Sequence, residues 1–241
     1  MKDVFRVRRM WRPRADLKDR YDVVIIGGGS HGLATAYYLV KNHGVRSVAV
    51  LERSYIGSGA AGRNTTIIRS NYRTPEGAAF YGRSVQLYEG LGADLDFNLL
   101  FSQLGHLTLA HSERAMVTMT ERAEVNQLLG IDSRLIYNDE IGRLCPELDL
   151  SDHPTWPIMG ALYHPPGGII RHDAVVWGFA RGADRGGVEI HPYTEVTGIE
   201  SANGRVTGVK TNRGSFQHSY PPRAANVTEL TQAFFATDPK R

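Results

Sequence analysis

Asp22-Val-Val-Ile-Ile-Gly-Gly-Gly-Ser-His-Gly32 is the stretch that decides the fold, because an apolar run in it breaks into spaced glycines. Gly27 permits a tight turn after a buried strand, and Gly29 lets backbone approach a pyrophosphate closely. Gly32 allows the next helix to pack tightly on the sheet. The positive end of that helix then faces the phosphates. The stretch therefore predicts a dinucleotide-binding βαβ unit.

The residues around this stretch complete the pattern of a βαβ unit. Strands are expected at Tyr21–Ile26 and Ser47–Leu51, and Gly44 ends the helix between them. Apolar residues at helical spacing predict that helix, namely Leu33, Ala36, Tyr37 and Val40. Glu52 follows 20 residues after Gly32, where a carboxylate accepts hydrogen bonds from a ribose diol and favours a cofactor without a 2′-phosphate. The alternative is a glycine turn in an ordinary βαβ unit.

Length and composition indicate a soluble globular protein of one large or two small domains. The chain has 241 residues, 41% of them hydrophobic, which is enough for a core. We expect no membrane partner, because no apolar stretch approaches the roughly 20 residues that cross a bilayer. Residues 1–20 are polar and do not resemble a secretory signal. The single cysteine, Cys145, excludes an intrachain disulfide, so we expect a cytoplasmic location.

Most of the positive charge lies at the N-terminus. Residues 1–20 hold eight Lys or Arg and three Asp, whereas the whole chain carries only +3. This basic arm lacks the aromatic interleaving and the repeated basic stripe of a nucleic-acid-binding protein, so no nucleic acid partner is expected. A solvated lead-in or a subunit contact fits it better. The predicted helices further on carry no metal-ligand pattern, and no metal is expected.

A loop of unusual composition follows Glu52. Residues 57–62 are small and glycine-rich, and residues 63–72 are polar with two arginines. Small residues allow the backbone to approach a bound group closely. Donors for a phosphate or a carboxylate come from Arg63, Asn64, Thr65 and Arg69. The alternative is an arginine loop that is only solvated.

The middle of the chain predicts the helices and strands of a second domain. Helices are expected at residues 76–91, Glu113–Leu129 and Asn138–Leu144, and strands at Gly105–Ala110 and Gly160–Tyr163. A further helix opens with His172 and Asp173 and shows one apolar stripe, namely Val175, Val176, Phe179, Ala180 and Ala183. Its positive end favours a neutral, nucleophilic His172, with Asp173 compensating. Capping or exposure is the common role of such a histidine.

The last regular segment is predicted as a β-meander over residues 188–214. Its strands are expected at Val188–His191, Glu195–Glu200 and Arg205–Thr211, with a turn at Ala202-Asn203-Gly204. Residues 215–241 contain no glycine and include Pro221-Pro222, so no strand-turn-helix return is expected there.

Three segments carry a resemblance to a known family. They are VVIIGGGSHGLATAYYL at residues 23–39, RNTTIIRSNY at residues 63–72, and Arg171-His-Asp173 before the following helix. With them the chain resembles the beta subunits of heterotetrameric sarcosine oxidase, within the glycine oxidase and D-amino acid oxidase group of flavoproteins, over about residues 20–214. The resemblance implies an α/β fold with a FAD-binding Rossmann-type, glutathione-reductase-like domain and an α+β substrate domain.

The resemblance implies an enzyme that demethylates sarcosine, or a similar small N-methyl amino acid, oxidatively. The products would be glycine and formaldehyde, or methylenetetrahydrofolate when tetrahydrofolate is the co-substrate, with O2 reduced to H2O2. FAD and a covalent FMN would be the cofactors. Other sarcosine oxidase subunits, the alpha subunit especially, would be the partners in a heterotetramer.

The same resemblance assigns roles to single residues. Arg69 and Tyr72 would bind the substrate carboxylate, and a bidentate arginine suits a small amino acid. His172 would carry FMN covalently, since a flavin linkage needs an unprotonated ring nitrogen. The residues around FAD would be Gly27, Gly29, Ser30, His31, Gly32, Glu52, Arg53, Arg63, Asn64, Thr65, Thr66 and Val196.

The resemblance also implies a domain plan. It comprises the basic arm 1–20, a FAD-binding domain over 21–90 and 164–214, part of a substrate domain over 91–163, and a divergent tail over 215–241. Family members continue well beyond this point, so we expect a C-terminally truncated chain with both domains incomplete, binding FAD weakly or not at all by itself. Two alternatives stay open: a non-catalytic fragment, and a related FAD amine oxidase or dehydrogenase acting on dimethylglycine or glycine.

Overall fold

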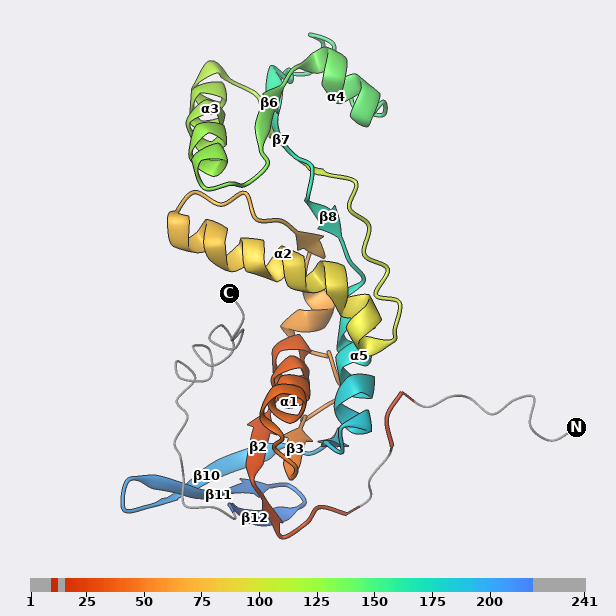
Figure 1. Cartoon of the computed structure of the whole chain (residues 1–241), viewed down its shortest axis with the longest axis vertical. Helices are drawn as coiled ribbons and strands as arrows, with labels where there is room; N and C mark the ends of the chain where they lie inside the picture. Colours follow the sequence, from red (N-terminus) through yellow and green to blue (C-terminus); the bar gives the residue numbers. More distant parts are fainter. Residues whose placement is uncertain (1–9, 13–15, 219–241) are drawn as a thin grey trace, which may run out of the picture. The chain divides into compact units, whose positions relative to one another are not determined.

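The computed structural model describes residues 10–12 and 16–218, so much of the predicted basic arm and most of the predicted divergent tail lie outside the described residues. The chain divides into two compact units, and Figure 1 labels the helices and most of the strands. The first unit joins the residues up to 59 with those from 179 onward, and the second comprises residues 60–178. The predicted domain limits, which lie elsewhere, stay a prediction.

The first unit is built around a three-stranded parallel sheet. Its order is β2–β3–β9, with β2 at Val23–Ile26, β3 at Val48–Leu51 and β9 at Glu189–His191. Helix α1, Ser30–His43, joins β2 to β3 and ends at Gly44, whose φ of 64° is left-handed. The predicted βαβ unit and its closing glycine are confirmed.

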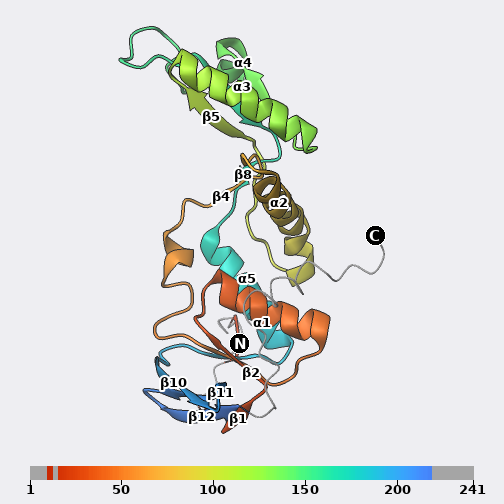
Figure 2. The same ribbon diagram turned by 90° about the vertical axis from the view of Figure 1, so that its left-hand side faces the viewer.

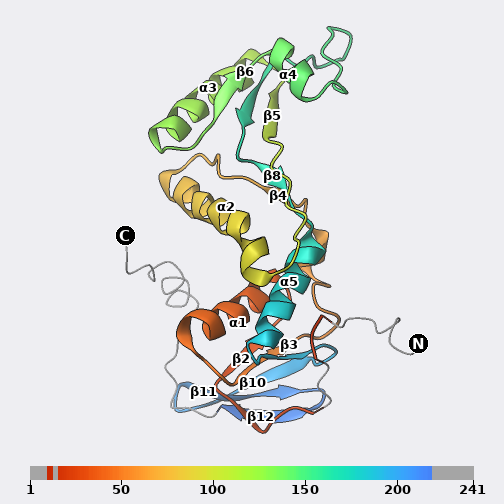
Figure 3. The same cartoon turned by 45° about the vertical axis from the view of Figure 1, so that its right-hand side comes forward.

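A second sheet packs on this parallel sheet. Its order is β1–β12–β11–β10, comprising Arg20–Tyr21, Gly214–His218, Arg205–Thr211 and Val196–Ala202. Ala49 and Leu51 of β3 form a core cluster with Tyr21 and Val209 from the second sheet. Because side chains alternate along a strand, Val48 and Val50 point to the other face. Figure 3 shows β10, β11 and β12 next to β2 and β3.

Helix α5, His172–Arg185, carries the predicted apolar stripe, and all five stripe residues are buried. Its later half belongs to the first unit. There the ring of Phe179 lies 5.8 Å from that of Tyr37 and 6.1 Å from that of Tyr38 on α1, measured between centroids. The stripe therefore contributes to helix–helix packing, as the periodicity indicates.

The predicted meander is wrong in two respects. Strand β9 is no part of it, because its buried residues pair in parallel with β3 in the first sheet. Strand β12 lies in residues assigned to the divergent tail and pairs with β11 and β1. The segment 214–218 holds a single apolar residue, so no alternation predicts it. The hairpin of β10 and β11 at Asn203-Gly204 is confirmed.

The second unit contains a long helix and a small antiparallel sheet. Helix α2 spans Pro75–Leu95 and begins at Thr74, whose Oγ1 accepts a hydrogen bond from the backbone N–H of Gly77. The sheet has the order β5–β7–β6, comprising His106–Ala110, Gly160–His164 and Arg134–Ile136. Helix α3, Glu113–Leu128, packs along this sheet (Figure 2). Helix α4 spans Asn138–Leu144 and contacts β7.

Apolar residues cover both faces of that small sheet. Leu162 of β7 packs with Ala110, Met119 and Ala123, which brings α3 onto one face. Ala161, its neighbour, packs with Ile136, Ile141 and Ile158 on the other face, which α4 and the following loop cover. The second unit thus has its own hydrophobic core.

Short elements connect the rest of the second unit. A 3-10 turn at Ala60–Arg63 precedes β4, Ile67–Ile68, which pairs antiparallel with β8, Gly168–Ile169. Two-residue strands are too short to leave a periodic pattern, and the sequence did not predict them. The α/β class itself is confirmed. Across the described ranges, no helix combines the length and apolar character needed to cross a bilayer.

Candidate functional site

The glycine turn of the first unit has a geometry that only glycine permits. Gly27 has a φ of +108°, and a Cβ on Gly32 would lie 2.0 Å from the carbonyl oxygen of Gly27. A Cβ on Gly28 would lie 2.9 Å from that of Glu52. Gly29 is the N-cap of α1 and supplies no side-chain cap, and the first turn holds no acidic residue. The helix N-terminus therefore presents backbone N–H groups suited to phosphate.

Glu52 is buried next to this turn. One carboxylate oxygen accepts a hydrogen bond from the N–H of Gly28 at 2.8 Å, and the other from that of Ser54 at 2.9 Å. The carboxylate thus orients the glycine turn and keeps further lone pairs for a ligand. Its binding to a ribose diol stays a prediction. Arg53 is exposed.

The segment that leads to Val196 runs beside Glu52. The N–H of Tyr193 donates to the carbonyl of Ser54 at 2.9 Å, and that of Thr194 to the carbonyl of Glu52 at 2.8 Å. Val196 itself packs against the core of the first unit. The structure thus brings together the predicted cofactor residues that belong to this unit, namely Gly27, Gly29, Ser30, His31, Gly32, Glu52, Arg53 and Val196.

The other predicted cofactor residues lie in the second unit, on the loop before β4. Arg63, Asn64 and Thr65 are exposed. Thr66 has a φ of +63°, which is strained for a β-branched residue. The side chain of Asn64 accepts a hydrogen bond from the N–H of Thr66 at 2.7 Å and donates to the carbonyl of Ala61 at 2.6 Å. The strained conformation is thus held by local hydrogen bonds.

The same loop lies beside the segment that carries His172. The N–H of Ile170 donates to the carbonyl of Thr66 at 3.0 Å, next to the β4–β8 pair. His172 is partly buried, and its Nδ1 has no hydrogen-bond partner among the described residues. Arg171 donates to both oxygens of Asp173, which lowers the pKa of that carboxyl. The carboxylate of Asp173 is thus paired with Arg171, and its compensation of His172 stays a prediction.

Arg69 and Tyr72 form one stacked group after β4. The guanidinium carbon of Arg69 lies 4.4 Å from the ring centroid of Tyr72, whose other neighbour is the ring of Tyr81 at 3.8 Å. Nη1 of Arg69 donates to Oδ1 of the buried Asn71 at 3.0 Å. The guanidinium is thus half-buried and oriented, with donors left for a carboxylate. The two predicted substrate residues lie side by side.

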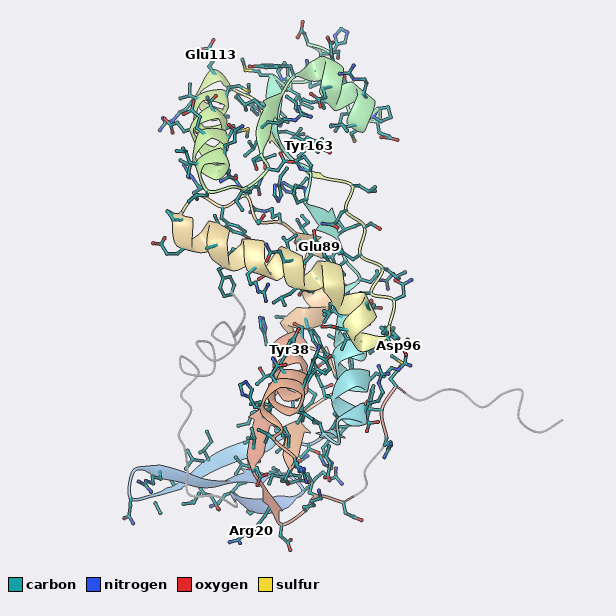
Figure 4. All side chains as sticks on the ribbon, in the orientation of Figure 1. Arg20, Tyr38, Glu89, Asp96, Glu113 and Tyr163 are labelled. Atoms are coloured by element: carbon teal, nitrogen blue, oxygen red, sulfur yellow. The ribbon has the colours of Figure 1, made fainter. Side chains whose placement is uncertain are left out.

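Sequence reasoning missed three residues around this pair. They come from other elements, and together with the pair they make the arginine–histidine cluster, namely Arg69, Tyr72, His106, Arg122 and His164. Figure 4 labels Glu113 at the start of α3, the helix that carries Arg122, and Tyr163 beside His164 on β7. No spacing links these residues in sequence. The register of β5 with β7, which pairs His106 with His164, creates the contact.

His164 is fully buried and held as one neutral tautomer. Its Nε2 accepts a hydrogen bond from the N–H of Ser70 at 3.2 Å, so its Nδ1 donates to the carbonyl of Asp132 at 2.6 Å. Burial lowers the pKa of His164, and burial followed by the charge of Arg69 lowers that of His106 to about 4. Both imidazoles are therefore neutral at pH 7.

The cluster is cationic. Burial, then the charges of Arg69 and Arg73, lower the pKa of Arg122, which stays charged because guanidinium is so basic. Among the described residues, no carboxylate is found in the charges that shift the pKa of Arg122 or His106. Two guanidinium groups and two neutral imidazoles in a half-buried place attract an anion. The arrangement suits a small carboxylate.

A family model described as FAD dependent oxidoreductase matches residues 22–227. The chain is 51% identical over 212 residues to the sarcosine oxidase subunit beta of Rhizobium meliloti (strain 1021), a match that covers 87% of this chain and 51% of the relative. It is 28% identical over 201 residues to the mitochondrial dimethylglycine dehydrogenase of Rattus norvegicus, covering 82% and 22%. The chain spans about half the length of the sarcosine oxidase beta subunits that it matches.

A solved structure shares the fold. The L-proline dehydrogenase of P. horikoshii superposes with a TM-score of 0.77 at 30% identity, over 84% of this chain and 52% of that chain. Because the glycine turn and every strand from β2 to β12 lie within the residues that the family model matches, the likeness extends beyond the dinucleotide motif.

Proposed function

The chain belongs to the FAD dependent oxidoreductase family, and on that premise we propose that it is the FAD-bearing subunit of a sarcosine oxidase. In this reaction sarcosine, water and O2 give glycine, formaldehyde and H2O2, so the N-methyl carbon is oxidised and oxygen is reduced. Bound FAD supplies the two-electron acceptor for the amine. The residues of this chain bind and orient the reactants and exclude water.

The observation that carries this proposal is the half-buried guanidinium of Arg69. It stacks on Tyr72 and has no carboxylate partner among the described residues. A planar guanidinium with free donors fits the carboxylate of a small amino acid. The 51% identity to a sarcosine oxidase subunit beta supports an N-methyl amino acid as that substrate.

The first unit fits FAD. Gly28 and Gly32, which admit no Cβ, let the turn pack closely against Glu52 and Gly27, and the uncapped start of α1 next to this turn offers backbone N–H groups to a pyrophosphate. Glu52 would hold the ribose. A FAD-binding role is also proposed for Arg63, Asn64, Thr65 and Thr66, which lie on the loop before β4 in the second unit.

The proposal includes a second flavin and partner subunits. The buried, unpartnered Nδ1 of His172 supports covalent FMN at that nitrogen. The name of the relatives, a subunit beta, supports an alpha-type subunit as partner. Tetrahydrofolate as the co-substrate of the assembly is part of the same proposal. The single cysteine, Cys145, fits a cytoplasmic setting.

Dimethylglycine is the second candidate substrate. The likeness to dimethylglycine dehydrogenase favours it, because Arg69 would recognise any small amino acid through its carboxylate. The chemistry is otherwise the same, since a methyl group on nitrogen is oxidised. Glycine as the substrate and a chain without catalytic activity are the two other outcomes that the experiment below distinguishes from sarcosine and dimethylglycine.

An anaerobic titration tests the function. The chain is purified with the subunits that copurify with it, reconstituted with FAD, and mixed with sarcosine, dimethylglycine or glycine without oxygen. We expect bound flavin to lose its absorbance most rapidly with sarcosine. Faster bleaching with dimethylglycine would make dimethylglycine the substrate in place of sarcosine. Flavin absorbance that stays unchanged with every amine would overturn the enzymatic function.

Denaturation tests the second flavin. We expect yellow colour to stay with the unfolded wild-type chain and to disappear in His172→Ala. This result would assign the covalent flavin to His172. His153→Ala, which changes an exposed histidine of the same unit, is the matched control. Colour retained in His172→Ala would contradict the assignment.

A further inference from the structure

We propose that Arg122 of α3 is a positioning residue for the substrate-binding pair Arg69 and Tyr72. The inference rests on the proposed function, because it concerns the same carboxylate site. Arg122 acts through the backbone of Asn71, which lies between the two members of the pair. It would not touch the substrate.

Three consecutive residues of this segment are held by three side chains from two distant elements, β7 and α3. The N–H of Ser70 donates to Nε2 of His164 on β7. The carbonyl of Asn71 accepts from Nε of Arg122 at 2.7 Å and also from its Nη2. The carbonyl of Tyr72 accepts from Nδ2 of Asn126 at 2.8 Å. The sheet and α3 therefore fix the course of the chain that presents the pair.

Asn71 links Arg122 to Arg69. Its side chain is fully buried, and its Oδ1 accepts the hydrogen bond from Arg69 while its own carbonyl is held by Arg122. A shift of the Asn71 peptide would move that Oδ1 and release the guanidinium of Arg69. Arg122 thus controls the orientation of Arg69 through one residue.

The charges around Arg122 argue against an incidental contact. Its guanidinium is half-buried and lies within the field of Arg69 and Arg73, which oppose its charge. Two nitrogens on one carbonyl use the fork of the guanidinium, which a lysine does not have. The fork, rather than the charge alone, is therefore the feature to test.

Two substitutions separate the fork from the charge. Arg122→Lys keeps the charge and removes the fork, whereas Arg122→Gln removes both. Arg114→Lys and Arg114→Gln are the matched controls, because Arg114 is exposed about two turns earlier on α3 and, within the described residues, makes no hydrogen bond or ion pair with the segment 69–72. All variants are compared as the full chain with its copurifying subunits.

Hydrogen exchange of the segment 69–73 reports positioning without any need for activity. We expect both Arg122 variants to raise exchange in this segment at least about tenfold, since its backbone anchor is lost. Both Arg114 variants should match wild type. Unchanged exchange in Arg122→Gln would overturn the proposal.

Kinetics distinguish positioning from general damage. We expect Arg122→Lys and Arg122→Gln to raise KM for sarcosine about 10-fold with kcat nearly constant, because carboxylate binding is uniform between ground and transition state. In an Arg69→Gln background, Arg122→Gln should add nothing further. An Arg122→Lys enzyme equal to wild type, or additive effects in the double variant, would refute the role.

The two proposals fail in different ways. A wild-type assembly that is not bleached by any amine refutes the proposed function, while the exchange measurement still decides the role of Arg122. A wild-type assembly that oxidises sarcosine, with Arg122 variants that behave like the Arg114 controls, refutes the positioning role alone.

Discussion

The glycine turn and the arginine–histidine cluster, each proposed to bind an anion, are built in opposite ways. The turn consists of consecutive residues that pack closely because Gly28 and Gly32 have no Cβ, and the uncapped start of α1 supplies backbone N–H groups beside it. The cluster uses side chains from the segment after β4 and from β5, β7 and α3, which meet only in the folded unit. The turn is therefore encoded locally, whereas the cluster depends on register and packing.

This difference governs how each site tolerates change. A substitution in the turn acts through steric overlap at the same place. A substitution in the cluster acts through the loss of a partner for a buried polar group elsewhere. The following variants separate the two kinds of effect.

Gly32→Ala should have the largest effect. The new Cβ would overlap the backbone carbonyl oxygen of Gly27, so α1 must move away from the sheet. We expect a loss of about 3 kcal/mol or more of unfolding free energy in urea, together with loss of FAD binding. Gly59→Ala is the control, because a Cβ there meets nothing within 4 Å. Equal stability of both variants would contradict the steric origin.

His164→Phe should break the cluster. The substitution keeps a ring of similar size but leaves the N–H of Ser70 and the carbonyl of Asp132 without their partner. We expect about 2 kcal/mol of destabilisation, measured by urea unfolding. His153→Phe, at an exposed site of the same unit, should change stability by less than about 0.5 kcal/mol. An unchanged free energy of unfolding in His164→Phe would show that these hydrogen bonds make no net contribution to stability.

Glu52→Gln tests whether the glycine turn also depends on a side chain. Each carboxylate oxygen accepts one backbone N–H, whereas an amide has only one accepting oxygen. One N–H of Gly28 or Ser54 therefore loses its acceptor, at a cost of about 1 to 2 kcal/mol in unfolding free energy. Glu195→Gln, exposed in the same unit, should match wild type.

The smallest effect concerns pH. His106 has a pKa of about 4 in the fold and 6.5 as an unperturbed side chain, so only the unfolded chain binds this proton between those values. Its contribution to stability is present above pH 6.5 and is lost as pH falls towards 4. His106→Gln should reduce the drop between pH 7 and pH 5 by less than about 1 kcal/mol, because solvent screens a partly exposed group. His153→Gln, which changes an exposed histidine, is the control. A loss of stability between pH 7 and pH 5 that is as steep in His106→Gln as in this control would contradict the assignment.

The sequence predicted the locally encoded parts of the molecule. Gly44 ends α1, α4 has the predicted bounds Asn138–Leu144, and the stripe of α5 is buried, because each depends on residues near in sequence. The pairing of β9 with β3 was missed, since a short strand with a single apolar residue carries no signal for its neighbour. Strand β12 was missed for the same reason.

The candidate sites show the same limit. The glycines, Glu52 and Arg69 were found from the sequence because their pattern or their family segment is continuous. Arg122 and His164 were not, since an arginine on an amphipathic helix and a histidine at a strand end are common. Only the hydrogen bonds to Ser70 and Asn71 distinguish them.

The pairing of Ala49 with Glu189 has a consequence for the order of folding. Closing a loop of that length costs about 4 kcal/mol of chain entropy, so the contact is late and contributes to slow folding. During synthesis, β3 leaves the ribosome long before residue 191, whose carbonyl accepts the N–H of Glu52. A nascent chain that ends within the second unit therefore holds the glycine turn without that main-chain support.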